Sequence, residues 1–153
     1  MSNEFEIKPF SGVGPLRFGM TPQEVATVLG PPEASRRSFM NTLIEYRGWL
    51  TTMYEKDSDL LYEIGFSRFF ETLTYKGTNI FKDPDREVLK NLCTEDGQPY
   101  EALGFIVLLK LGMTLTGFHD GDEEKKTCSA FAKGTWGVEK DDLKPFSLDA
   151  TIL

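Results

Sequence analysis

The segment from Thr21 to Pro32 restricts the chain most strongly, because it encodes a helix and also limits its length. Thr21 is a favourable N-cap, Pro22 suits the first helical position, and Glu24 completes a capping box three residues after the cap. Gly30 and the two prolines that follow it prevent the helix from continuing. So short a helix has only one narrow apolar stripe to bury, so it has to pack against a larger element.

Strand patterns follow this helix. After a basic loop at Ser35–Ser38, Leu43–Tyr46 and Trp49–Tyr54 have the aromatic and threonine-rich composition typical of β-strands. Residues 60–66 then alternate as in a half-buried strand. The residues expected on one face of this strand are Leu60, Tyr62, Ile64 and Phe66, and those expected on the other face are Leu61, Glu63 and Gly65.

A second helix start occurs at Asp83, where a capping residue again precedes a proline and acidic residues, and this helix is predicted to reach Leu92. The apolar run Leu103–Leu109 is long enough for a strand that is buried on both faces. Met113–Phe118 predicts the next strand, and Cys128–Lys133 is expected to pair with it.

The order of a helix followed by strands therefore occurs twice, and the matching residues Glu24 and Glu87 stand 63 positions apart (87 − 24). These patterns predict an α+β fold with a largely antiparallel sheet and short helices packed on one side. A degenerate duplication, with half-repeats at 12–76 and 77–137, would explain this repeated order, as would a chance recurrence of two proline-containing helix starts. Each half is too small to bury its own face well, so we expect one domain spanning 1–153.

Charge restricts the class of partner. The 153 residues carry a net charge of −7, which disfavours nucleic acid and anionic membrane surfaces and favours a cationic partner, although solubility alone would also explain it. The amino terminus has neither a basic region nor an apolar run, and nowhere do about 18 apolar residues stand together. We therefore expect a cytoplasmic protein without a membrane partner.

Three segments are similar to known families. The motif within Gly12–Gly30 resembles the "G-M-T/S-x-x-E-V-x-x-x-L-G" helix start of small bacterial proteins, including BamE-like and β-lactamase-inhibitor-like modules. Tyr75–Phe81 and Leu115–Asp120 are similar to proteins of toxin–immunity loci. The resemblance implies a module that binds proteins through a sheet face and its loops. BamE-like proteins are usually exported lipoproteins, but this chain has no signal or lipobox, so an inhibitor or immunity role remains.

The cysteines and the histidine limit the metal chemistry. Cys93 and Cys128 could pair, but a cytosolic location favours free thiols packed as small hydrophobic side chains. Two cysteines and one histidine cannot form an ordinary structural zinc site unless carboxylates complete it. We expect no metal.

The turn at residues 119–124 is the candidate partner-binding site. It comprises His119, Asp120, Asp122, Glu123 and Glu124. The four acidic residues form either a solvated loop or an electrostatic landing site for a basic protein. His119 beside two acids suits a general base or a partial metal site, but a solvated imidazole in a Gly/Asp-rich turn is the simpler interpretation.

No motif predicts a cofactor. The glycines before Pro15 lack the features of a phosphate loop or a dinucleotide fingerprint, and turning the chain into the first strand is their expected role. The aromatic cluster Phe66–Phe70 could stack nucleic-acid bases, but it lacks basic neighbours, so core packing or an interface is favoured.

Three functions remain open. The first is a non-catalytic immunity or inhibitor protein that neutralises a cognate toxin, for instance a basic nuclease. The second is a small-molecule or peptide-binding module with an aromatic-lined pocket. The third, an enzyme centred on His119, has the least support, because no serine or cysteine motif accompanies the histidine.

Overall fold

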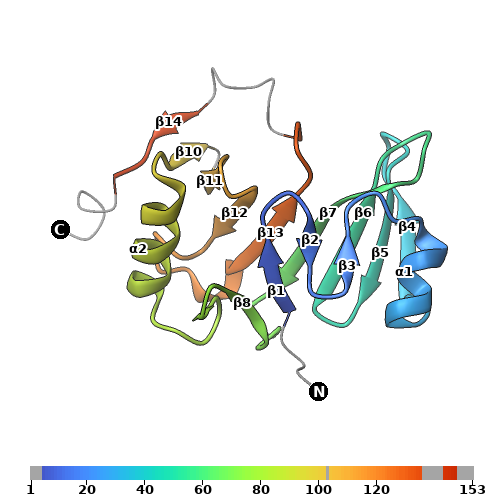
Figure 1. Cartoon of the computed structure of the whole chain (residues 1–153), viewed down its shortest axis with the longest axis horizontal. Helices are drawn as coiled ribbons and strands as arrows, with labels where there is room; N and C mark the ends of the chain where they lie inside the picture. Colours follow the sequence, from blue (N-terminus) through green and yellow to red (C-terminus); the bar gives the residue numbers. More distant parts are fainter. Residues whose placement is uncertain (1–4, 103, 136–142, 148–153) are drawn as a thin grey trace.

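The computed structural model describes residues 5–102, 104–135 and 143–147. The fold is α+β, as predicted, with two α-helices, a nine-stranded antiparallel sheet and a smaller five-stranded sheet (Figure 1). The helices are α1 (Pro22–Leu29) and α2 (Asp85–Asp96), and a 3-10 turn, η1, spans Glu123–Lys125. The strands are β1 (Phe5–Lys8), β2 (Gly12–Val13), β3 (Leu16–Arg17), β4 (Ala34–Arg37), β5 (Leu43–Arg47), β6 (Leu50–Tyr54), β7 (Leu61–Ser67), β8 (Leu73–Tyr75), β9 (Thr78–Asn79), β10 (Tyr100–Ala102), β11 (Phe105–Leu108), β12 (Met113–Thr116), β13 (Thr127–Phe131) and β14 (Lys144–Pro145).

The large sheet consists of two meanders of four strands each, with the two-residue strand β14 added at one edge beside β10. Its strand order is β14-β10-β11-β12-β13-β7-β6-β5-β4, so the meanders β4–β7 and β10–β13 meet through their last strands. At this junction β7 and β13 are antiparallel, with Ile64 opposite Ala130 and Phe66 opposite Cys128. The small sheet has the order β3-β2-β1-β8-β9, and its β1–β8 pair is parallel.

The two halves have the same order of elements. A short hairpin, β2–β3 or β8–β9, precedes each helix, and a meander follows each helix. One buried apolar cluster contains side chains from both halves, including Val25 of α1, Leu92 of α2 and Ile64 of β7. Both helices therefore pack over the same face of the large sheet, at opposite ends of the molecule (Figure 1).

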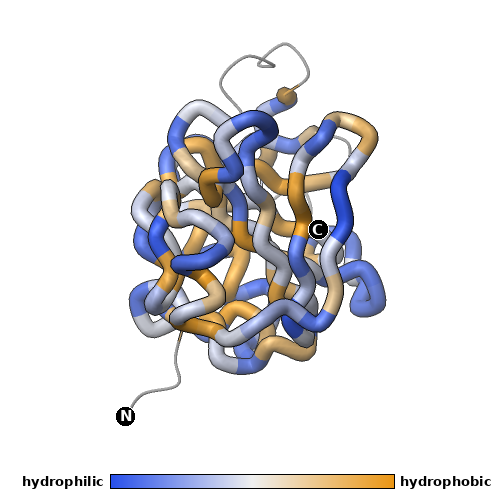
Figure 2. Tube along the Cα trace, turned by 90° about the vertical axis from the view of Figure 1, so that its right-hand side faces the viewer, coloured by the Kyte–Doolittle hydropathy of each residue, from blue (hydrophilic) through white to orange (hydrophobic). Residues whose placement is uncertain are grey.

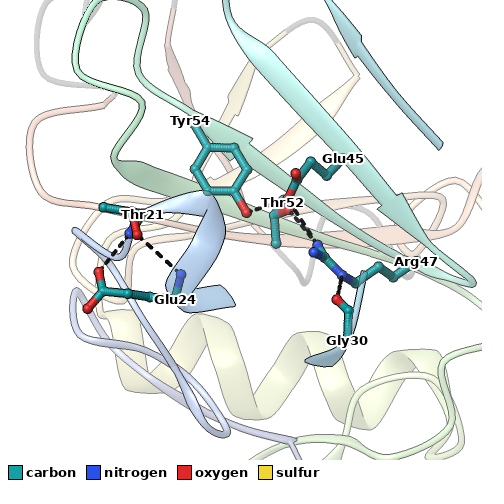
Figure 3. A network of polar contacts seen from close by, with 7 residues as sticks. All are labelled: Thr21, Glu24, Gly30, Glu45, Arg47, Thr52 and Tyr54. Atoms are coloured by element: carbon teal, nitrogen blue, oxygen red, sulfur yellow. Dashed lines mark hydrogen bonds and ion pairs between the residues drawn. The ribbon is translucent and has the colours of Figure 1, made fainter. Parts of the chain in front are cut away.

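The capping box that begins α1 is formed as predicted. The Thr21 hydroxyl accepts a hydrogen bond from the Glu24 backbone N–H (3.2 Å), and the Glu24 carboxylate accepts one from the Thr21 N–H (2.9 Å) (Figure 3). Gly30 ends the helix. This local sequence specifies its own structure because each group satisfies the other's unpaired donor.

The prediction that Asp83 caps the second helix is wrong. The N-cap is Pro84, and the Asp83 carboxylate instead accepts a hydrogen bond from the backbone N–H of Asn79 (3.0 Å) in the preceding strand, β9. The helix also continues past Leu92 to Asp96, where Gly97 ends it with a left-handed conformation (φ 83°). Tertiary contacts, and not a side-chain cap, fix its start.

Two strand predictions need correction. The expected basic loop at Ser35–Ser38 is mostly the exposed edge strand β4, which pairs with β5. On β7 the pairing register with β6 shifts beside Tyr62, which breaks the predicted alternation, so Leu61 is buried together with Ile64 and Phe66. Tyr62 and Glu63 consequently both lie outside the core cluster.

The predicted strand Leu103–Leu109 corresponds to β11, although Leu103 itself lies outside the described residues. Ile106, Val107 and Leu108 are fully buried, which confirms a strand covered on both faces. Along the trace, hydrophobic stretches run through the interior and hydrophilic stretches lie mostly at peripheral turns (Figure 2).

A buried polar network fastens the end of α1 to the sheet. Arg47 of β5 donates from Nε to the Gly30 carbonyl (3.0 Å), and its Nη1 lies 3.1 Å from Glu45 Oε1 (Figure 3). Tyr54, fully buried, donates its hydroxyl proton to the same carboxylate (2.7 Å), and burial raises the pKa of Tyr54 to about 12. These groups are largely satisfied by one another, so this network is structural.

The end of α2 is fastened differently. The Asp96 side chain is buried and accepts backbone hydrogen bonds from Gln98 (3.2 Å), Lys110 (2.8 Å) and Leu111 (3.0 Å). The last two donors belong to the turn between β11 and β12. Each helix is therefore tied to its own meander by a charged side chain.

Cys93 and Cys128 are free and buried, as predicted. Burial raises the pKa of Cys93 to about 11 and that of Cys128 to about 12. The polar tail was expected to form a loosely held strand or coil. Its described part includes β14, a two-residue strand that pairs with β10.

Candidate functional site

The side of the large sheet that faces away from the helices, here called the outer face, carries an open groove. Thr51 of β6, Gly65 of β7 and Ser129 of β13 lie side by side in register at its centre. The groove has a volume of about 250 Å³. Small polar residues and two larger side chains line it: Thr51, Ser67, Thr127 and Ser129, with Trp49 and Met53.

Gly65 has no side chain, so it leaves the centre of this groove empty. A Cβ atom added there would lie 3.4 Å from Ser129 Oγ and 3.8 Å from Thr51 Cβ, so a methyl group fits without displacing a neighbour. Glycine inside a strand costs about 0.5–1 kcal/mol relative to alanine and often marks the close approach of a ligand or another backbone. No close contact around Gly65 requires a glycine, so its effect is to leave space on the outer face.

An exposed aromatic pair stands at one end of the groove. Trp49 and Phe69 are 55% and 50% exposed, and their ring centroids lie 4.7 Å apart. The Arg68 guanidinium stacks on Phe69 at 4.5 Å from the ring centroid. Adjacent exposed aromatic side chains, with an arginine beside them, have the composition of a protein interface.

Glu63 lies two residues before Gly65 on β7, so its side chain is on the same outer face. Its cross-strand neighbours are the apolar residues Met53 and Phe131. Within the described part of the chain, Glu63 forms no hydrogen bond or ion pair. Burial without a partner raises the pKa of its carboxyl group to about 7.

The predicted acidic turn is brought together as expected. Gly117 begins it with φ 81°, and a Cβ there would lie only 2.6 Å from the Asp122 carbonyl oxygen, so the turn closes tightly. The Asp120 carboxylate accepts a hydrogen bond from the Asp122 N–H (3.1 Å). Asp120, Glu123 and Glu124 are exposed, and Asp122 is partly exposed.

Lysines neutralise part of this turn. Lys126, only 5% exposed at its side chain, contacts Asp85 of α2, lies 3.3 Å from Glu123 and stacks on Phe118. Lys125 lies 3.9 Å from Asp122. In the described part of the chain, Asp120 and Glu124 form no such pair, so these two acids dominate the outward charge of the turn.

The prediction of a solvated His119 is wrong. Its side chain is 10% exposed, its Nε2 lies 3.3 Å from Glu101 Oε2, and its ring packs against Phe146 (centroids 5.9 Å apart). The turn folds back on β10 and on the segment around β14, which together cover the imidazole. His119 therefore does not belong to the exposed acidic surface.

The acidic turn and the aromatic pair lie at the same end of the large sheet. Residue Thr127 starts β13 directly after the turn and pairs with Ser67. The Ser67 N–H in turn donates to the Trp49 carbonyl (3.0 Å). Aromatic and acidic side chains are consequently presented on neighbouring strand ends.

Two further surface pockets, each of about 420 Å³, bear on the small-molecule hypothesis. The first is lined mainly by polar residues around Lys56 and Lys133, and the second lies between Lys76 and Lys90, beside α2. Each has a single tyrosine, Tyr62 or Tyr75, so neither is the aromatic-lined pocket expected for a ligand site.

Several features of the candidate site were not predicted from the sequence. The groove and Glu63 lie on three strands, and Trp49 and Phe69 lie just outside the ends of two of them, so their proximity depends on strand pairing that could not be deduced locally. Gly65 was the available indication, because it interrupts an otherwise alternating strand. Among residues 5–102, 104–135 and 143–147, no three His, Cys, Asp or Glu side chains are grouped closely enough to hold a metal ion.

Neither helix in the described part of the chain is long and apolar enough to cross a membrane. No family model matches the chain, and neither a curated protein nor a solved structure shows a significant similarity to it.

Proposed function

We propose that this protein is a non-catalytic binding protein of the immunity or inhibitor type, which neutralises a basic protein such as a cationic toxin domain. The outer face at the Trp49 end of the sheet is its binding surface. The proposal places the protein in the cytoplasm, where an antidote would meet its toxin.

The aromatic pair carries this proposal. Trp49 and Phe69 each leave about half of a large side chain in water, and they stand beside a groove on an uncovered part of the sheet. Binding hot spots are enriched in tryptophan, tyrosine and arginine that lie near the centre of an interface. A partner that covers Trp49, Phe69 and Arg68 would bury such a set together.

Charge supports a basic partner. The net charge is −7, and the acidic turn adds exposed carboxylates at the same end of the sheet as the aromatic pair. Complementary charge of this kind speeds diffusional encounter and suppresses wrong partners. Nucleic acid is disfavoured as a partner, because the phosphate backbone would meet the same negative field.

The experiment is capture of the partner from the native host with tagged protein, followed by measured affinities. Trp49→Ala with Phe69→Ala should weaken binding by about 30-fold or more, since hot-spot residues contribute at least about 2 kcal/mol. Phe39→Ala with Met40→Ala is the matched control, because these side chains are exposed at the opposite end of β5. The control should bind like the native protein.

Two results would contradict the proposal. One is the absence of any specific protein partner, with a small ligand raising the melting temperature instead, which would favour the small-molecule module. The other is a captured partner whose affinity falls equally in both double variants, since a surface elsewhere would then be responsible.

A further inference from the structure

We propose that Glu63 receives a basic side chain, lysine or arginine, which the protein partner lays into the groove over Gly65. This inference rests on the proposed function and specifies the chemistry that the same surface recognises. It is carried by the geometry of the outer face of β7.

The position of Glu63 is unfavourable for the isolated protein. A carboxylate flanked by Met53 and Phe131 loses hydration, and within the described residues burial alone shifts the pKa of Glu63, with no contribution from a nearby cation. The Glu63 side chain is half-buried, and a partly desolvated charge without a partner is costly, so an added opposite charge would offset part of that cost. The free protein therefore holds a site for a cation that a second molecule can supply.

The chain's own neighbouring arginines are engaged elsewhere. Arg36, on the same face three strands away, donates to the Tyr46 hydroxyl (2.9 Å). Arg37 forms a two-pronged pair with Asp59, and Arg68 stacks on Phe69. Each of these cations already has a partner, so none is free to neutralise Glu63.

The local backbone brings the carboxylate and the groove together. The register shift beside Tyr62 places Glu63 on the outer face with Gly65 two residues further along the strand, a separation of about 7 Å. Bulges frequently re-aim side chains at functional sites. Glu63 does not itself line the groove, but Gly65, its neighbour along β7, and Met53, its partner across β6, both do, so the groove ends beside Glu63.

A long basic side chain fits this arrangement better than a compact cation. Lysine and arginine carry an aliphatic stem that packs on apolar surface while the charged head reaches a polar group. Met53 and Trp49 offer apolar contact along the groove, and the hydroxyl groups of Thr51 and Ser129 can accept additional hydrogen bonds from a guanidinium.

The test compares single variants in binding to the captured partner. Glu63→Gln should weaken binding by about 30-fold or more, because the partner's cation would be left desolvated and unpaired. Glu55→Gln makes the same charge change at an exposed site outside the groove and should alter affinity less than about twofold. Gly65→Val, which fills the groove, should also weaken binding, and thermal melting checks that it remains folded.

A double-mutant cycle identifies the cation. When one lysine or arginine of the partner is replaced by methionine, its effect on affinity should be coupled to that of Glu63→Gln. It should show no coupling energy with Glu55→Gln. If Glu63→Gln keeps native affinity while the Trp49/Phe69 double variant loses it, the inference is wrong and the proposed function stands. If the native protein captures no protein at all, the proposed function fails and the inference fails with it.

Discussion

At Glu63, one carboxyl group is held on an apolar part of the sheet without a partner, and its pKa rises from the ordinary 4.5 to about 7. Between these two values the folded state binds more protons than the unfolded state, so the free energy of unfolding falls as the pH rises. Natural proteins retain such costly groups chiefly where function needs them.

Glu63→Gln is therefore expected to stabilise the protein at pH 8, by up to about 3 kcal/mol, and to have little effect at pH 4. Urea denaturation of both proteins at the two pH values measures this difference. Equal stability of the two proteins at pH 8 would mean that the carboxylate is well hydrated or paired.

The two thiols provide a second test at single residues. Because burial raises the pKa of Cys93 to about 11 and that of Cys128 to about 12, very little reactive thiolate forms at pH 8. A thiol reagent such as dithiobis-nitrobenzoate should react slowly with the folded protein. After denaturation it should react rapidly with both cysteines. A fast reaction of Cys128 in the folded protein would contradict its complete burial.

At the level of the helices and strands, the sequence predicted an element correctly where the contacts that fix it lie within the element itself. Thr21 and Glu24 cap each other, so α1 could be placed correctly. Asp83 has the same local pattern, yet it pairs with the backbone of Asn79. The register shift at Tyr62 depends on β6, so alternation within β7 alone could not reveal it or the position of Glu63.

The attachment of α2 is a further determinant that the sequence does not display. Asp96→Ala removes the acceptor for three backbone donors, two of them in the turn between β11 and β12. We expect a loss of about 3 kcal/mol in the free energy of unfolding. Glu124→Ala, which removes an exposed carboxylate, should change it by less than about 0.5 kcal/mol.

Chemical denaturation of both variants checks the comparison. If Asp96→Ala were as stable as the native protein, the buried carboxylate would not be fastening the helix, and packing of Leu89 and Leu92 would have to do so alone.

For the whole molecule, two separate contributions to binding are expected. The groove and aromatic pair should set how long the complex lasts, whereas the acidic turn should set how fast it forms. The predicted acidic cluster is present, but lysines pair with Glu123 and Asp122, so neutralising all four acids would also disturb the structure.

Replacing only Asp120 by Asn and Glu124 by Gln avoids this difficulty and changes the net charge from −7 to −5, since two negative charges are removed. The variant should associate more slowly with the partner and show a flatter dependence on salt, with an unchanged dissociation rate. Stopped-flow measurements at two ionic strengths test this. An unchanged association rate at low salt would make the turn an ordinary solvated loop.

The central claim, that the partner covers the outer face at the Trp49 end, is tested most directly by side-chain oxidation of the free protein and of the complex with hydroxyl radicals. Trp49, Met53 and Phe69 should become protected in the complex, because all three face the proposed binding surface. Phe39 and Met40, exposed at the far end of β5, serve as internal controls and should remain equally reactive. Protection of Phe39 and Met40 with unchanged oxidation of Trp49 and Phe69 would contradict the account.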